Sequence, residues 1–316
     1  MYAHENYRKV KEIIENRRQS AIAEAEARNF EVASLSDDIR AIDEEMRNTG
    51  LLLFKTACAG GDITPIRERN LFLGEERRRA LKKLGLPEDY TEIKYQCEKC
   101  SDTGFVGTKM CSCFKEMLIT ENIRSSGMGM LIEKQSFENF SLDRYKNSPD
   151  EYRRMELNFN VAKEFADNFG EGGKNLLFIG KTGTGKTHLS TAIAKKVIEK
   201  GFEVLYDSAQ NIVTAYEDDR FKSGYGPYEP KGTKYIECDL LIIDDLGTEF
   251  VNQFTVSCLY NLLNTRQNKN LSTVISTNLT AEELARKYED RIYSRLVGRD
   301  SKILLFVGSD MRIEGR

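Results

Sequence analysis

One eight-residue segment constrains the fold of this chain more than any other. Residues 180–187 are Gly-Lys-Thr-Gly-Thr-Gly-Lys-Thr, a full match to the phosphate-binding pattern G-x-x-x-x-G-K-[ST]. Residues 175–180 form an apolar, strand-like run before it, and residues 188–200 continue as an apolar helix closed by Gly201. The glycines let backbone N–H groups point at phosphate oxygens, and the helix N-terminus adds its positive dipole end. The segment therefore predicts a parallel α/β fold with a nucleotide phosphate site.

The loop requires partners that hold a metal ion and activate water. We expect Lys186 to contact the β- and γ-phosphates and the Thr187 hydroxyl to coordinate Mg²⁺. Residues 240–243 are four aliphatics that end in Asp244 and Asp245. We expect Asp244 to bind Mg²⁺, directly or through water, and Asp245 to act as general base. Without the loop, the pair would be interpreted as solvated carboxylates. The predicted nucleotide-binding residues are Gly180, Lys181, Thr182, Gly183, Thr184, Gly185, Lys186, Thr187 and Asp244.

A second polar tip follows another predicted strand. Residues 273–276 are strand-like, and Asn278 follows them. Its amide is expected to orient the water beside the γ-phosphate. The alternative is a plain turn residue, because Thr280 and Glu283 have the spacing of a capping box that starts the next helix.

Two arginines lie near the end of that helix. Arg291 and Arg295 are four residues apart and so share one helix face. Such an arginine can stabilise the phosphate charge in a neighbouring subunit, and the alternative is an ordinary surface salt-bridge helix.

The C-terminal half alternates between strand-like and helical patterns. This alternation predicts a parallel sheet with flanking helices. The strand-like runs are residues 176–179, 202–206, 240–243, 273–276 and 303–307.

Cysteine usage is unusual, with seven cysteines against two histidines. Cys97 and Cys100 form a CxxC pair, and Cys111 and Cys113 form a CxC pair ten residues later. Four thiolates satisfy tetrahedral Zn²⁺ with no open position, so we expect a structural zinc module. An iron–sulfur cluster and buried free thiols remain alternatives. The other cysteines, Cys58, Cys238 and Cys258, are expected to be packing residues.

The first part of the chain is helical in pattern. Apolar residues at 32, 35, 39, 42 and 46 form a heptad-like seam, which predicts a helical hairpin or short coiled coil within residues 1–48. It either packs only on itself or binds a partner. A further basic helix is expected from Pro65 to Gly85. We predict four parts: a helical region over 1–94, a zinc module over 95–115, a connector over 116–145 and the ATPase domain over 146–316.

Basic and aromatic residues are interleaved between Gln210 and Glu237. This mixture suits single-stranded nucleic acid, because bases stack on rings and cations meet phosphates. An ordinary long loop is the alternative. The residues are Tyr216, Arg220, Phe221, Lys222, Tyr225, Tyr228, Lys231 and Lys234.

Composition narrows the class of protein. Charged residues make up 31% of the chain and the net charge is −3, so any nucleic-acid contact must be local. No apolar run reaches about 18 residues, and the charged N-terminus has no signal-peptide h-region. We therefore expect a cytoplasmic protein.

Together the motifs resemble a known family. The ordered series GKTGTGKT, LLIIDDLG, STN, RIYSRL and DMR is similar to AAA+ ATPases of the bacterial replicative helicase loader family (DnaC/DnaI-like) and to the related IstB-type transposition helpers. The resemblance covers about residues 135–316. It implies Asn278 as sensor 1, Arg295 as the arginine finger with Arg291 as alternate, and Arg312 as a sensor-2 phosphate contact.

The resemblance also implies partners and cofactors. They are ATP with Mg²⁺, a hexameric replicative DNA helicase bound by the N-terminal region, single-stranded DNA, and self-association or a neighbouring ATPase. Two alternatives are an IstB-like ATPase that assists a transposase and a nucleotide-switched adaptor with little hydrolysis. The chain departs from many relatives by carrying Asp245 where they have glutamate, and we expect no separate helical lid.

Overall fold

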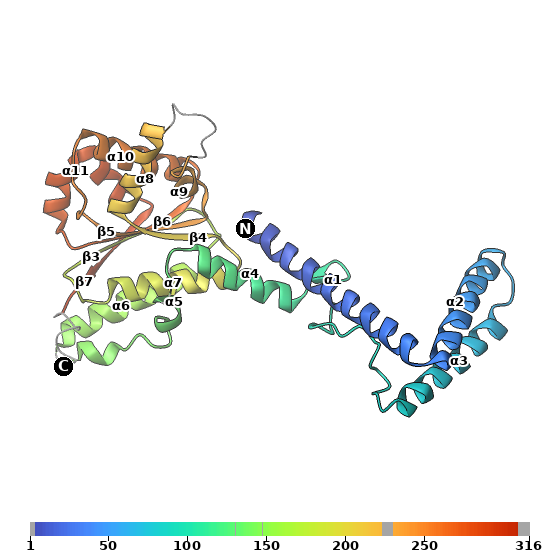
Figure 1. The fold of residues 1–316 in the computed structure, drawn as a ribbon. Helices are drawn as coiled ribbons and strands as arrows, with labels where there is room; N and C mark the ends of the chain where they lie inside the picture. The colour runs from blue at the N-terminus through green and yellow to red at the C-terminus, as the bar shows by residue number, and fades with distance from the viewer. Residues whose placement is uncertain (1–3, 130, 147, 223–229, 309–316) are drawn as a thin grey trace. The chain divides into compact units, whose positions relative to one another are not determined.

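Five parallel strands form the sheet that the sequence predicts. The computed structural model describes residues 4–129, 131–146, 148–222 and 230–308, and Figure 1 draws it as a ribbon. The strands stand in the order β4-β5-β6-β3-β7, and their pairings are parallel. Their bounds are β3 (Asn175–Gly180), β4 (Val204–Ser208), β5 (Leu240–Leu246), β6 (Ser272–Thr277) and β7 (Ser301–Phe306). The predicted α/β class is confirmed.

The strand order decides which residues can meet. Strand β6 lies between β3, which leads into the glycine-rich loop, and β5, which ends in the two aspartates. Because parallel strands present their carboxyl ends at one edge, the residue after β6 lies between the loop and the acids. Asn278 occupies that position.

Alternation along each strand builds two cores. In β3, Leu176 and Phe178 face one core, while Leu177 and Ile179 face the other. Helices α6 (Pro149–Asp167) and α7 (Lys186–Glu199) cover the first face (Figure 1). The second face is covered by α8 (Ala209–Lys222), α9 (Thr233–Glu237), α10 (Gln253–Asn268) and α11 (Ala281–Leu296).

The segment predicted to be a connector contributes to the first core. It contains the end of α4 (Ser112–Ser125), the short helix α5 (Leu131–Lys134) and a 3₁₀ turn, η1 (Leu142–Tyr145). Met128, Ile132 and Tyr145 are buried with the sheet residues. The backbone N–H of Tyr206 on β4 also donates to the carbonyl of Ser126 at 2.8 Å. These contacts make the segment part of the unit that carries the sheet.

The contacts divide the chain into two compact units. One unit contains residues 9–114, and the other contains residues 115–308 with residues 4–8.

In the unit of residues 9–114, the helical hairpin has a different partner from the one predicted. Helix α1 (His4–Leu35) ends before Ser36, whose side chain accepts the N–H of Ile39 and caps α2 (Asp37–Cys58). Helix α2 packs along α3 (Thr64–Lys83), so α2 and α3 form the hairpin, rather than residues 1–48 alone. The heptad-like seam predicted helix but not its interruption, because a single capping residue can end a helix without disturbing the apolar spacing.

The four-cysteine segment follows α3. It contains a two-stranded antiparallel hairpin of β1 (Phe105–Val106) and β2 (Lys109–Met110) and leads into α4. Among the described residues, no helix is long and apolar enough to cross a membrane.

Candidate functional site

The glycine-rich loop has the backbone geometry of a phosphate cradle. Gly183 and Gly185 have φ values of +78° and +94°, in the left-handed region that favours glycine. A Cβ atom at Gly185 would lie only 2.8 Å from the Tyr145 hydroxyl oxygen. Helix α7 begins at Lys186, so the N–H groups of its first turn are directed toward the loop. Both the backbone conformation and the available space therefore require glycine at 185.

Lys186 lies inside this loop. Its ammonium Nζ donates to the carbonyl oxygens of Gly180 at 2.6 Å and Lys181 at 2.8 Å. It also donates to Asn278 Oδ1 at 2.8 Å. Residue 186 is 5% exposed, so a cation is held in a site shielded from water. A cation shielded from water attracts phosphate more strongly than a cation in bulk water does.

The same asparagine reaches the second aspartate. Asn278 Nδ2 donates to Asp245 Oδ1 at 3.2 Å. The amide therefore joins Lys186 to Asp245, although 59 positions separate those two residues in the sequence (245 − 186 = 59). Thr280 and Glu283 form the capping box as well, so the cap and the inward-facing amide coexist.

Asp244 has different hydrogen-bond partners from Asp245. Its two carboxylate oxygens accept hydrogen bonds from the hydroxyls of Tyr206 on β4 and Ser276 on β6. Burial, followed by the Asp244 charge, raises the pKa of Tyr206, so this hydroxyl remains a donor at neutral pH. Asp244 is half-buried, and it does not line the cavity described next. This placement favours action on a metal ion through water.

A cavity of about 250 Å³ opens at the loop. Thr187, Asp245 and Asn278 line one side of it. The other side comes from the predicted connector, which the sequence reasoning did not associate with the site. These lining residues are Gln135, Asn139, Phe140, Ser141, Arg144 and Tyr145. No motif marks them; the only sequence signal is the clustering of Phe140 and Tyr145 in a polar stretch.

Two contacts hold this wall on the loop. The Tyr145 hydroxyl donates to the Thr184 carbonyl at 3.0 Å. His188, the first residue after the motif, lies within hydrogen-bond distance of the Ser136 carbonyl (3.0 Å) and Asn139 Oδ1 (2.9 Å) through Nε2. Burial lowers the pKa of His188, which favours the neutral ring. These contacts tie the first turn of α7 to the wall.

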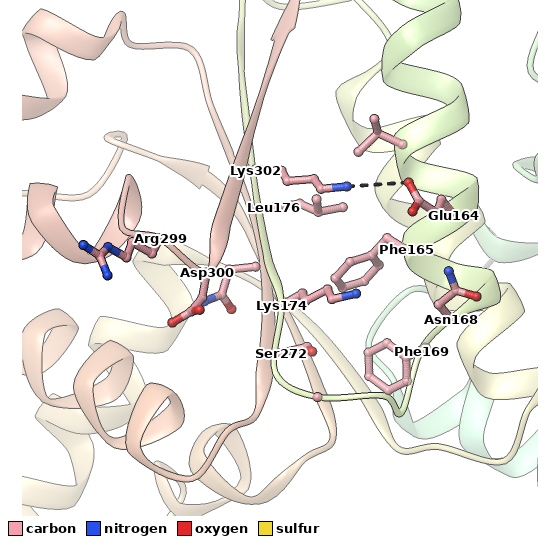
Figure 2. Close-up of a pocket in the computed structure, with 13 residues that line it drawn as sticks. Glu164, Phe165, Asn168, Phe169, Lys174, Leu176, Ser272, Arg299, Asp300 and Lys302 are labelled. Atoms are coloured by element: carbon pink, nitrogen blue, oxygen red, sulfur yellow. Dashed lines mark ion pairs between the residues drawn. The ribbon is translucent and has the colours of Figure 1, made fainter.

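A second cavity, of about 220 Å³, lies at the amino ends of β3, β6 and β7. Figure 2 shows Phe165 and Phe169 beside Lys174, and Lys302 pairs with Glu164 at 3.5 Å. It lies at the sheet edge opposite the glycine-rich loop and has no phosphate-binding backbone. We assign it no part in the nucleotide site.

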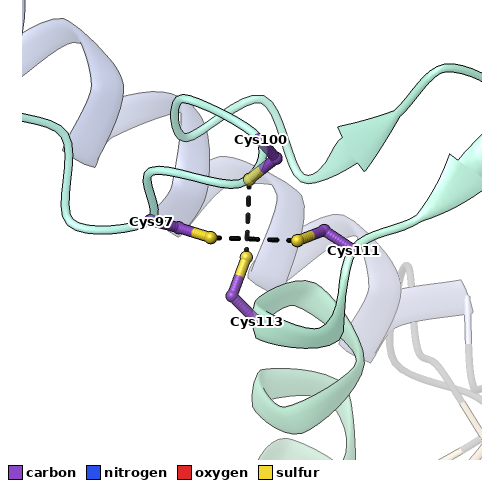
Figure 3. Close-up of side chains that lie close together, drawn as sticks. All are labelled: Cys97, Cys100, Cys111 and Cys113. Carbon is purple, nitrogen blue, oxygen red and sulfur yellow. Dashed lines mark hydrogen bonds between the residues drawn. The ribbon is translucent and has the colours of Figure 1, made fainter.

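The four predicted zinc ligands converge. Figure 3 shows the sulfur atoms of Cys97, Cys100, Cys111 and Cys113 pointing toward one centre. All four lie within 4.8 Å of one another, with Cys97–Cys111 at 3.8 Å and Cys100–Cys113 at 3.6 Å. A tetrahedral zinc ion with Zn–S bonds of about 2.3 Å requires sulfurs about 3.8 Å apart. The distances fit a single ion, exceed a disulfide bond, and leave too little room for a multi-iron cluster.

The backbone and a buried acid support the cysteine site. A backbone hydrogen bond from Cys100 lowers the pKa of the Cys97 thiol to about 7, whereas burial raises that of Cys113. Asp102 is 1% exposed and accepts the N–H groups of Gln96 at 2.8 Å and Cys97 at 3.0 Å. Arg17 on α1 donates to Asp102 at 2.5 Å. Asp102 could not be predicted from the sequence, because an aspartate in a Ser-Asp-Thr-Gly turn gives no metal signal.

Comparison with known proteins decides the family. The profile described as IstB-like ATP binding protein matches residues 134–303, more than half of the chain. The chain belongs to this family. The replicative helicase loader DnaC of Escherichia coli (strain K12) is 25% identical over 183 residues, which cover 58% of this chain and 71% of DnaC. The uncharacterized protein YdaV of the same strain is 26% identical over 190 residues, which cover 58% and 69%.

One solved structure also aligns with the chain. The crystal structure of the DnaC helicase loader aligns at 24% identity with a TM-score of 0.45, covering 54% of this chain and 98% of that chain. The predicted resemblance to helicase loaders and IstB-type ATPases is confirmed, and ATP binding is a property of the family.

The arginines of the IstB-like domain do not all lie at the cavity. Arg295 stacks on Tyr260 at 4.3 Å and donates to Asn264 at 2.7 Å, so α10 holds it within its own chain. Arg291 is exposed on the same helix. Arg312 lies outside the described residues.

The predicted nucleic-acid segment of this IstB-like protein is partly occupied by internal contacts. Arg220 stacks on Phe254 at 5.3 Å, and Lys231 pairs with Asp218 at 2.9 Å. Lys234 lies over the Tyr235 ring at 4.7 Å, whereas Phe221 is 74% exposed. Tyr225 and Tyr228 lie outside the described residues.

Proposed function

We propose that this protein is an ATP-hydrolysing loader of a replicative helicase. The contact series Lys186–Asn278–Asp245 across one cavity is the observation that carries hydrolysis, because it places a cation, a polar amide and a carboxylate on one small volume. The loading role rests on the similarity to a protein named as a replicative helicase loader.

Each residue has a distinct role in the proposed reaction. Lys186 neutralises charge on the β- and γ-phosphates, and the loop N–H groups hold their oxygens. Asp245 accepts a proton from the attacking water, and Asn278 orients that water. Thr187, and Asp244 through water, would hold Mg²⁺, which would supply charge neutralisation when bound. The donors fit this ion, because a hydroxyl and a carboxylate are the hard oxygen ligands that Mg²⁺ prefers.

The arginine role is proposed for a neighbouring subunit. Arg295 must first leave Tyr260 and Asn264, whereas Arg291 is already exposed on the same face. An arginine finger contributes on the order of 10³–10⁵ in rate. Arg295→Ala and Arg291→Ala should therefore be compared in the assembled complex. Unchanged turnover in both variants contradicts any finger on α11.

Steady-state ATP turnover tests the core of the proposal. We expect turnover by the full chain, stimulated by single-stranded DNA, and a background rate from Lys186→Ala. Exposed Phe221 is the residue we expect to stack on a base, so Phe221→Ala should weaken the stimulation. Turnover that DNA does not alter contradicts DNA binding. The absence of all turnover supports a nucleotide-switched adaptor instead.

A capture experiment tests the partner. We expect tagged full-length protein to retain a purified hexameric replicative helicase, through the unit that contains the zinc module. Membership of the IstB-like family leaves one other candidate, the transposase helper that the resemblance to IstB-type proteins implies. Capture of a transposase, with no capture of the helicase, would establish that alternative.

A further inference from the structure

The turn that carries Asp245 has an unusual backbone. Asp245 has φ +53°, in the left-handed region that residues other than glycine rarely adopt. The register between β5 and β6 also shifts between Ile243 and Leu246. A residue held in this region is strained and persists where surrounding contacts impose it. The contacts around residues 245–249 therefore decide where the Asp245 carboxylate points.

Strand β6 holds the first half of the turn. The Asp245 N–H donates to Ser276 Oγ at 3.0 Å. Thr277 Oγ1 donates to the Leu246 carbonyl at 2.6 Å. These two side chains belong to the strand that leads to Asn278, so β6 positions both the amide and the acid.

Glu249 holds the second half. This residue is 2% exposed, although it carries a carboxylate. Its Oε2 accepts the Gly247 N–H at 2.9 Å, and its Oε1 accepts the hydroxyl of Tyr288 on α11. Burial, followed by the bond to Glu249, raises the pKa of Tyr288, so the hydroxyl stays protonated and donates.

A third contact joins the turn to the same helix. Lys287, next to Tyr288, donates to the Gly247 carbonyl at 2.5 Å. Gly247 itself has φ +108°, and a Cβ there would lie 2.6 Å from Leu279. The Gly247 carbonyl is thus bonded directly to a side chain of α11, and the Gly247 N–H is linked to α11 through Glu249.

We propose that Glu249 is a positioning residue for ATP hydrolysis, which holds the Asp245 turn on α11 through Gly247 and Tyr288. The inference rests on the proposed ATPase function. Burying a carboxylate is costly unless hydrogen bonds satisfy it, and an apolar residue would fill the same core at lower cost. The two hydrogen bonds of Glu249 join the turn that carries Asp245 to the helix that carries Arg291. The buried carboxylate therefore fixes the position of that turn.

The test compares Glu249→Ala and Glu249→Gln in the full-length protein. Glu249→Ala removes the acceptor for Gly247, and we expect kcat to fall by about 10-fold to 100-fold, as for small misplacements of reacting groups. The ATP dissociation constant should not change, because the glycine-rich loop keeps its contacts. Glu249→Gln should keep most of the turnover, since an amide oxygen can still accept the Gly247 N–H. Glu282→Ala, an exposed acid in the first turn of α11, is the matched control.

Hydrogen exchange supplies a readout that does not depend on turnover. In Glu249→Ala, amides in residues 246–248 should exchange faster than in the wild type, while those in residues 180–187 stay unchanged. Unchanged exchange in residues 246–248, or wild-type kcat in Glu249→Ala, overturns the proposal. Equal loss in the Ala and Gln variants also overturns it, because charge rather than the hydrogen bond would then matter.

A second variant covers the case in which Glu249→Ala does not fold. Tyr288→Phe keeps the ring and removes only the hydroxyl that donates to Glu249, so a smaller fall in kcat with unchanged ATP affinity supports the proposal. Wild-type kcat in that variant contradicts it. A wild-type protein without turnover contradicts the proposed ATPase function separately, and the exchange result then decides the role of Glu249 in the turn.

Discussion

The cysteine site and the nucleotide site are built over very different distances along the chain. All four cysteines lie within residues 97–113, and their support, apart from Arg17, comes from the same stretch. The nucleotide site joins Tyr145, Lys186, Asp245 and Asn278, which come from separate elements in and around one sheet. A local site can form once a short turn is closed, whereas a distributed site needs the whole sheet in register. A substitution that disrupts one site should therefore leave the other site intact.

The largest effect is expected from a zinc ligand. Cys111→Ser should abolish stoichiometric zinc, because a structural zinc site in a small module carries about 10–16 kcal/mol of binding free energy. ATP turnover should remain, since no contact of the nucleotide site uses this residue. Elemental analysis and an ATPase assay measure both outcomes. Cys58→Ser, at an exposed cysteine outside the cluster, is the control. A wild-type protein purified without zinc contradicts the assignment.

The converse variant is Lys186→Ala. We expect ATP turnover to fall by about 10²–10³-fold, as when one preorganised charge-stabilising donor is removed. The zinc content should equal that of the wild type. Lys196→Ala, at an exposed lysine on the same helix, should leave turnover unchanged. Loss of zinc in Lys186→Ala would show that the two sites are not independent.

A buried arginine, Arg266, is expected to stabilise the sheet on which the nucleotide site depends. Arg266 is 1% exposed and donates to the carbonyls of Tyr235 at 2.8 Å, Cys238 at 3.0 Å and Ser272 at 2.5 Å. Arg266→Met would remove a donor from each of these carbonyls. We expect the free energy of unfolding of the unit that carries the sheet to fall by about 3 kcal/mol.

Denaturant unfolding followed by circular dichroism measures this loss. Arg154→Met, at an exposed position of α6, supplies the control and should unfold like the wild type. If the two variants unfold alike, the hydrogen bonds of Arg266 do not stabilise the sheet.

The smallest effect is expected from Asp102, the buried acid that supports the cysteine site. Asp102→Asn keeps a residue that tolerates φ +52° but removes one carboxylate acceptor and the charge facing Arg17. Zinc affinity should fall by about 10–100-fold, the usual cost of losing a supporting acid behind a metal ligand. Competition with a chromogenic chelator measures it, with Asp89→Asn as an exposed control. Unchanged affinity would mean that the turn holds its shape without Asp102.

The contrast between local and distributed sites also separates the features that could be predicted from those that could not. The glycine-rich loop, the Asp244–Asp245 strand end and the cysteine cluster have spacings that chemistry imposes, so the sequence predicts them. Asn278 was predicted from its place after a strand, and it contacts both Lys186 and Asp245. The wall around Phe140 and the buried Glu249 were missed. Neither has a spacing rule, because each acquires its role only from a neighbour far away in the chain.

The sequence by itself determined the strand–helix alternation, the phosphate loop and the four-thiolate cluster, because each depends on residues close together in the chain. Tertiary structure alone decided that β6 lies between β3 and β5, that α2 pairs with α3, and that Arg295 stacks on Tyr260. It also decided that Asp244 lies behind two hydroxyls while Asp245 faces the cavity. The physical reason is that strand order and side-chain partners follow from burying both faces of the sheet at once, a condition that no local pattern encodes.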